Sequence, residues 1–101
     1  MMCGLVGQFG RASLDPDAWL VAAVGSLQHR GPDDEGTWSD PERQVWLGHR
    51  RLSVVDLSTA AHQPFTSAGG GIVVVFNGEI YNHRSVAAEL RSAGVRFRSS
   101  S

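Results

Sequence analysis

The chain has 101 residues and a formal net charge of −1, with 19% charged and 42% hydrophobic residues. This length predicts a single domain with a modest core, and the balanced charge does not indicate a nucleic-acid partner. The single cysteine excludes an internal disulfide, which is typical of a reducing compartment, and no apolar run is long enough to cross a membrane. Without a basic and apolar leader either, the sequence predicts a cytoplasmic protein.

The amino-terminal segment contains the only cysteine, Cys3. Removal of an initiator methionine needs a small second residue, so we expect translation to begin at Met2 and processing to leave Cys3 as the first residue. A terminal cysteine carries a thiol and an α-amine with a pKa of about 7.7–8.0, which can take the thiol proton. The apolar residues that follow predict a buried strand that would hold this nucleophile rigidly. The alternative is a small buried hydrophobe, the commoner role of a lone cysteine.

A helix is predicted after this strand. Asp15 is a favourable N-cap, Pro16 suits the first helical position, and Asp17 suits the positive end of the helix dipole. The helix should end near Gln28 or His29, before a Gly-Pro pair. The residues expected to face the core share one side of this helix: Trp19, Ala22, Ala23 and Leu27.

The middle of the chain predicts a hairpin and a long loop. Residues 37–39 and 44–49 are expected to pair around a turn at 39–42. Residues 50–56 should continue as an extended or irregular segment. Residues 57–71 should form a surface loop that ends in three glycines.

The last third of the chain predicts a buried strand and a second helix. Residues 72–76 are continuously apolar, which is typical of a strand buried on both faces. Asn82 can cap the following helix and Gly94 can end it, and residues 95–97 would begin a further strand. The residues of this helix expected to face the core are Val86, Ala87 and Leu90. The whole pattern is α+β, with strands between helices.

Asn77 and Gly78 directly follow the predicted buried strand. Attack of a thiolate on an amide carbonyl forms an oxyanion, which needs preorganised donors about 3 Å away. The side-chain amide of Asn77 and the backbone N–H of Gly78 could supply them, since glycine lets the backbone approach closely. The alternative is an ordinary hairpin turn, for which Asn-Gly is a strong signal.

Arg51 and Glu79 are candidate binding residues. Arginine pairs bidentately with a carboxylate, so Arg51 could anchor the α-carboxylate of an amino acid, and Glu79 could receive its ammonium group. A surface ion pair and a solvated carboxylate are the alternatives. The four histidines lack metal-ligand spacing, so no metal site is predicted, and His29 and His49 are expected to form hydrogen bonds within the fold.

Five sequence motifs occur in an order that resembles a known family. They are Met2-Cys3-Gly4, His29-Arg30-Gly31-Pro32-Asp33, residues 48–56 (GHRRLSVVD), Gln63-Pro64 and residues 76–83 (FNGEIYNH). Together they resemble the glutaminase domain of glutamine-hydrolysing asparagine synthetase, a class II glutamine amidotransferase and an N-terminal nucleophile hydrolase. Because the resemblance covers nearly the whole chain, residues 1–101 are expected to be the N-terminal portion of such a domain.

The resemblance implies a role for each candidate residue. Cys3 would form a γ-glutamyl thioester and release ammonia, and Asn77 and Gly78 would be the oxyanion hole. The family fold is a four-layer αββα sandwich, which this chain would contain without its carboxyl-terminal part. The glutamine-binding residues would be Arg51 at the α-carboxylate, together with Val54, Val55, Asn77, Gly78 and Glu79.

The resemblance also implies partners beyond L-glutamine. The ammonia would pass to a synthetase domain in cis that activates aspartate with ATP and magnesium, whereas no cofactor is expected within residues 1–101. A homodimer is compatible with the family. Two alternatives stay open: another class II amidotransferase with a different acceptor, and a non-catalytic fragment of the same fold.

Overall fold

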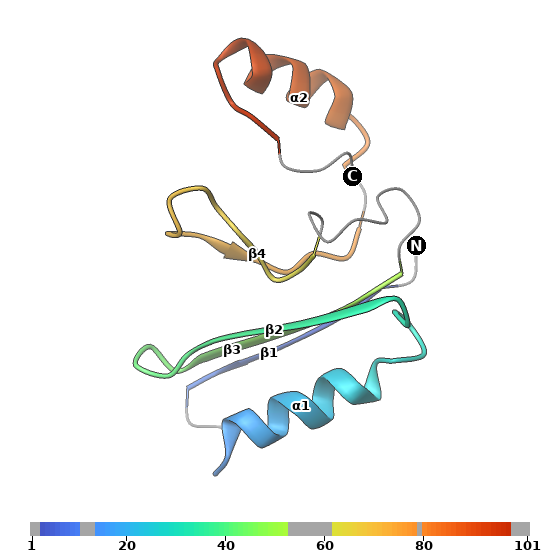
Figure 1. Ribbon diagram of the computed structural model, residues 1–101, viewed down its shortest axis with the longest axis vertical. Helices are drawn as coiled ribbons and strands as arrows, with labels where there is room; N and C mark the ends of the chain where they lie inside the picture. Colours follow the sequence, from blue (N-terminus) through green and yellow to red (C-terminus); the bar gives the residue numbers. More distant parts are fainter. Residues whose placement is uncertain (1–2, 11–13, 53–61, 79, 98–101) are drawn as a thin grey trace.

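The computed structural model describes residues 3–10, 14–52, 62–78 and 80–97. Its elements follow in the order β1, α1, β2, β3, β4, β5, α2. Figure 1 shows α1 on one side of a three-stranded sheet, the β4–β5 hairpin on the other side, and α2 beyond the hairpin. The prediction of an α+β fold is therefore confirmed. No helix in the described ranges has the length and apolarity needed to span a membrane.

The three-stranded sheet is antiparallel, with β3 in its centre. β1 (Gly4–Phe9) and β2 (Asp34–Asp40) both pair with β3 (Val45–Arg51). The predicted hairpin between β2 and β3 is confirmed, and both strands are longer than the sequence indicated. The register sets Gly4 opposite Arg50, which brings the residue before β1 to the end of β3.

Helix α1 (Pro16–Ser26) covers one face of this sheet. The side chain of Asp15 caps it by accepting a hydrogen bond of 3.1 Å from the N–H of Ala18, as predicted. The helix buries Leu20 and Val24 against Trp46 of β3, and these three residues form the core.

The predicted core face of α1 was partly wrong. Ala22 is exposed, and Trp19, Ala23 and Leu27 are only partly buried. Every position from Ala18 to Val24 is apolar, so periodicity alone does not select a face. Packing selects it instead, because the absence of a side chain at Gly48 of β3 leaves the room that Val24 fills.

The second hairpin consists of β4 (Phe65–Thr66) and β5 (Val73–Val74). The prediction that residues 72–76 form a strand buried on both faces was wrong, because β5 has two residues and Ile72 is 64% exposed. Val74 of β5 is 45% exposed as well, so no layer covers both faces of this segment in the described part of the chain. The predicted loop at 57–71 also contains β4, and residues 53–61 lie outside the described ranges.

Helix α2 (His83–Ser92) begins after Asn82, whose side chain makes no capping hydrogen bond. At its end the N–H groups of Gly94 and Val95 donate to the carbonyls of Arg91 and Leu90, with Gly94 at a φ of 92°. This is a Schellman end and confirms the predicted role of Gly94.

The predicted core face of α2 was wrong, because the helix buries no residue and Val86 and Leu90 are 38% and 39% exposed. The radius of gyration is 14.9 Å, above the value of about 13 Å for a compact domain of this size. Both facts have one cause: α2 lies beyond the hairpin, away from the core under the three-stranded sheet (Figure 1). Residues 95–97 form no strand in the structure.

Candidate active site

Cys3 lies directly before β1, where that strand meets the end of β3. It is 3% exposed and forms no disulfide. The backbone N–H of Leu52 lies 3.5 Å from its Sγ. The sulfur is therefore held beside Leu52, the residue that follows β3.

Two side chains donate to the carbonyl oxygen of Cys3. Arg30 Nε donates at 2.7 Å, and Asn77 Nδ2 donates at 3.1 Å. The donors come from segments 27 and 74 positions away in sequence. The tertiary fold thus fixes the backbone of the candidate nucleophile from two sides.

Arg30 belongs to the turn after α1, which is locked to β3. Arg50 Nε donates to the Gly31 carbonyl at 2.8 Å, and Arg50 Nη1 pairs with Glu35 Oε2 at 2.5 Å. A Cβ at Gly31 would collide with the backbone of Arg50 and Arg51, so only glycine fits this close approach. Reasoning from the residues had assigned no role to Arg30 or Arg50. The sequence did contain a signal for them: Arg30 precedes Gly31 in one of the five motifs, and Arg50 belongs to another.

Asn77 and Gly78 follow β5. The hydrogen bond from Asn77 Nδ2 to the Cys3 carbonyl places Asn77 next to Cys3. One N–H of the Asn77 amide is used by the Cys3 carbonyl, and an amide carries two such N–H bonds. The hairpin-turn alternative was wrong, because the described residues after Gly78 lead into α2 and form no strand. The Phe76 ring packs against Gly78, where an added Cβ would lie 3.0 Å from the ring.

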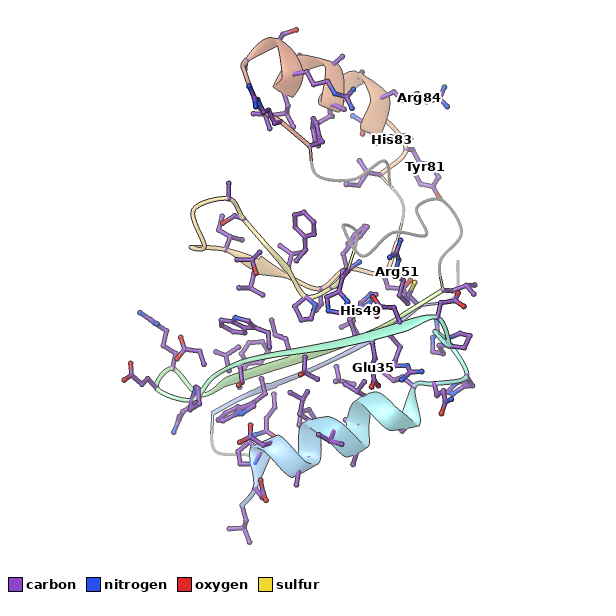
Figure 2. All side chains as sticks on the ribbon, viewed as in Figure 1. Glu35, His49, Arg51, Tyr81, His83 and Arg84 are labelled. Carbon is purple, nitrogen blue, oxygen red and sulfur yellow. The ribbon has the colours of Figure 1, made fainter. Side chains whose placement is uncertain are left out.

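Arg51 is the last residue of β3 and is 7% exposed, which does not fit the alternative of a surface ion pair. Figure 2 shows Arg51 and His49 on the hairpin side of the sheet, whereas Glu35 lies on the α1 side. The other predicted glutamine-binding residues, Val54, Val55 and Glu79, lie outside the described residues.

The histidines divide into buried and exposed cases. His49 is 1% exposed, and its Nε2 lies 3.1 Å from the Phe76 carbonyl oxygen, so its predicted hydrogen bond is confirmed. His29 is exposed in the turn after α1 and its side chain makes no hydrogen bond to the described residues, so that part of the prediction was wrong. His62 Nδ1 pairs with Asp34 Oδ2 at 2.6 Å.

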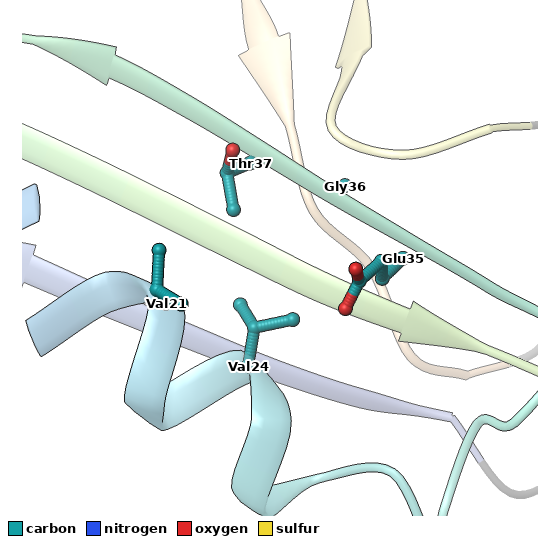
Figure 3. Close-up of a pocket in the computed structure, with 5 residues that line it drawn as sticks. All are labelled: Val21, Val24, Glu35, Gly36 and Thr37. Atoms are coloured by element: carbon teal, nitrogen blue, oxygen red, sulfur yellow. The ribbon is translucent and has the colours of Figure 1, made fainter. Parts of the chain in front are cut away.

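A hollow of about 310 Å³ lies between α1 and β2 (Figure 3). It contains none of the predicted site residues and opens on the α1 side of the sheet. It is therefore not a candidate for the glutamine pocket. The residues that line it are Val21, Val24, Glu35, Gly36 and Thr37.

A comparison with protein families identifies the chain. The model of the glutamine amidotransferase domain matches residues 2–101. The chain belongs to this family. The match confirms the family resemblance that the five motifs indicated.

This amidotransferase domain is also similar to individual proteins, two of which are named glutamine-hydrolysing asparagine synthetases. It is 35% identical to asparagine synthetase [glutamine-hydrolyzing] 3 of Bacillus subtilis over 95% of the chain, and 38% identical to a rice asparagine synthetase over 90%. It is also 44% identical to the amidase chry2 of Gibberella zeae over 70% of the chain. The matched regions span 16%, 15% and 11% of these proteins, so the chain is about a sixth of their length or less. No solved structure matches.

Proposed function

We propose that this chain is the N-terminal portion of the glutaminase domain of a glutamine-dependent asparagine synthetase. Its reaction is the hydrolysis of glutamine to glutamate and ammonia. One observation carries the proposal: the Asn77 amide reaches the backbone of Cys3, so a thiol and an oxyanion donor meet at one place. This is the pairing that acyl transfer through a covalent intermediate requires.

The first step is the attack of Cys3 Sγ on the side-chain amide carbon of glutamine. The α-amine of Cys3, freed by removal of the residues before it, takes the thiol proton and passes it to the leaving ammonia. The C–N bond breaks and a γ-glutamyl thioester forms. Water then attacks the thioester, releases glutamate and restores the thiol.

The other proposed residues bind and stabilise. Asn77 Nδ2 and the Gly78 N–H donate to the oxyanion during both steps. The buried guanidinium of Arg51 pairs with the glutamine α-carboxylate, which suits its planar fork of donors. Three residues outside the described ranges complete the proposed pocket: Val54, Val55 and Glu79.

The arrangement of the elements supports the proposed four-layer αββα sandwich. The order in space is α1, three-stranded sheet, β4–β5 hairpin and α2 (Figure 1). The exposed apolar side chains of β5 and α2 would be covered when further strands complete the second sheet.

The proposed partner of this domain is a synthetase domain in cis, in which ATP and magnesium activate aspartate to accept the ammonia. We also propose that the protein that carries this domain forms a homodimer. The described residues offer no group of three or more His, Cys, Asp and Glu side chains placed to hold a metal ion. No step described above uses one.

A different acceptor is the second candidate. The 44% identity to the amidase chry2, whose name is not that of an asparagine synthetase, favours an acceptor other than aspartate. Formation of asparagine from glutamine, ATP and aspartate by the protein that carries this chain would exclude this candidate. Glutamine hydrolysis without asparagine would support it.

The test of the glutaminase proposal is covalent capture. The purified protein is incubated with 6-diazo-5-oxo-L-norleucine, an electrophilic glutamine analogue, and its intact mass is measured. We expect one adduct on Cys3, protection by glutamine, and no adduct in Cys3→Ala. An adduct that persists in Cys3→Ala, or no adduct on a chain that begins at Cys3, would contradict the proposal.

A further inference from the structure

The backbone of Phe76 is held at both of its polar groups by side chains. His49 Nε2 lies 3.1 Å from the Phe76 carbonyl oxygen, and the Phe76 N–H donates to Gln63 Oε1 at 2.7 Å. His49 comes from the centre of the three-stranded sheet and Gln63 precedes β4. Phe76 is thus tied to two separate parts of the fold.

Little else holds this segment in the described structure. The β4–β5 ladder ends at Val74, and the Phe76 side chain is 44% exposed. Neither regular pairing nor burial of its own side chain therefore fixes Phe76. The two side-chain hydrogen bonds set the position of its peptide groups.

His49 is a fixed donor in this arrangement. Burial lowers the pKa of His49, although its hydrogen bond to the Phe76 carbonyl and the nearby Asp34 act in the opposite direction; His62 and Arg51 add to the lowering. The ring is therefore neutral near pH 7. Because a carbonyl oxygen only accepts, its single proton resides on Nε2.

Asn77 is the next residue after Phe76, and its amide donates to the Cys3 carbonyl. A displacement of the Phe76 backbone therefore moves Asn77, and the Gly78 N–H with it. Stabilisation of an oxyanion depends on donors at hydrogen-bonding distance from the developing charge, so small displacements weaken it. The anchors on Phe76 consequently affect where both donors lie relative to Cys3.

We propose that His49 and Gln63 are positioning residues that hold the oxyanion donors Asn77 and Gly78 over Cys3. This inference rests on the proposed glutaminase function. Neither residue touches the substrate in this proposal. Both act through the main chain of Phe76.

The experiment compares variants that remove each anchor with variants that restore it. His49→Leu removes the donor, and His49→Gln returns an N–H at a similar reach. Gln63→Met removes the acceptor while keeping the length of the side chain, and Gln63→Glu returns an oxygen. The matched control is His83→Leu, because the ring of His83, the first residue of α2, also forms a hydrogen bond with a backbone carbonyl, that of Ile80.

Two readouts separate positioning from general damage. The first is kcat and KM for glutamine hydrolysis, which passes through an oxyanion. The second is the rate at which iodoacetamide alkylates Cys3, a displacement at saturated carbon that forms no oxyanion. Loss of oxyanion donors therefore lowers kcat for glutamine hydrolysis but does not lower the alkylation rate.

We expect His49→Leu and Gln63→Met to lower kcat about 10- to 100-fold, with KM changed less than about threefold. The alkylation rate should stay within about twofold, since it does not depend on oxyanion donors. His49→Gln and Gln63→Glu should recover most of kcat, and His83→Leu should match the wild type.

The outcomes that overturn the inference are distinct from failure of the function. An active wild type with unchanged kcat in Gln63→Met and His49→Leu would overturn it alone. So would a parallel loss of kcat and of alkylation in all four variants. A wild type that begins at Cys3 but shows no Cys3-dependent hydrolysis would overturn the glutaminase proposal and this inference with it.

Discussion

The side-chain amide of Asn77 donates a hydrogen bond of 3.1 Å to the carbonyl oxygen of Cys3, although 74 positions separate the two residues. Arg30 Nε donates to the same oxygen at 2.7 Å. The first strand, the turn after α1 and the segment after β5 therefore meet at Cys3. These two bonds fix the backbone of Cys3, the nucleophile of the proposed glutaminase reaction.

Replacement of Asn77 by Asp tests the oxyanion role. The side chain keeps its shape, but it has no N–H to donate and brings a negative charge to the place where an oxyanion forms. We expect kcat for glutamine hydrolysis to fall about 10²- to 10³-fold. Asn82→Asp is the matched control, because the Asn82 side chain makes no capping hydrogen bond, and it should keep wild-type activity. Equal activities of the two variants would remove Asn77 from the proposed oxyanion hole.

Replacement of Arg30 by Met tests the second bond to the Cys3 carbonyl. The change removes a hydrogen bond from a charged donor to a buried acceptor, so the free energy of unfolding should fall by about 1.5–3 kcal/mol. Arg43→Met is the control: its ion pair with Asp40 leaves the arginine side chain 80% exposed, and solvent screens such a pair so that it contributes little to stability. Urea unfolding of both variants measures the difference. A smaller loss for Arg30→Met than for Arg43→Met would show that the bond at Cys3 is unimportant for stability.

Two glycine substitutions test the packing of α1 on the sheet. A Cβ at Gly48 would collide with Val24 Cγ2 and lie 3.1 Å from Leu20 Cδ1. Gly48→Ala should therefore destabilise the fold by about 1–3 kcal/mol. Gly25→Ala, within α1 itself, meets no atom within 4 Å, and it should stabilise the helix by about 1 kcal/mol. Thermal unfolding should show a lower midpoint temperature for Gly48→Ala and a higher one for Gly25→Ala. A higher midpoint for Gly48→Ala would contradict the close approach of α1 to Gly48.

The pH dependence of stability tests the burial of His49. Burial lowers the pKa of His49 in the folded state below its ordinary value near 6.5. Between these two pKa values the unfolded chain binds more protons, so the free energy of unfolding falls as the pH drops below about 6.5 and levels off below the folded pKa. His49→Gln cannot take up this proton. The stability difference between wild type and variant, measured by urea unfolding, should therefore be larger at pH 7.5 than at pH 5. A difference that does not change with pH would contradict the lowered pKa.

Much of the local structure was predictable from the sequence, because its signals act over a few residues. Asp15 caps α1 through a group three residues away, and Gly94 ends α2 because glycine adopts a positive φ without strain. The β2–β3 hairpin followed from the polar turn at residues 39–42 between two predicted strands. The five motifs were sufficient to indicate the family, which the match to residues 2–101 confirms.

Burial and long-range contacts were decided only by the tertiary structure. Residues 72–76 and α2 have apolar patterns typical of core elements, yet Ile72 and Leu90 are 64% and 39% exposed, because in the described structure few neighbours cover them. The core face of α1 depended on the space left by Gly48. The anchoring of Phe76 by His49 and Gln63, and the approach of Asn77 to Cys3, join segments far apart in sequence. The sequence determined local conformation and family, whereas the spatial arrangement of the candidate site depends on which surfaces pack together.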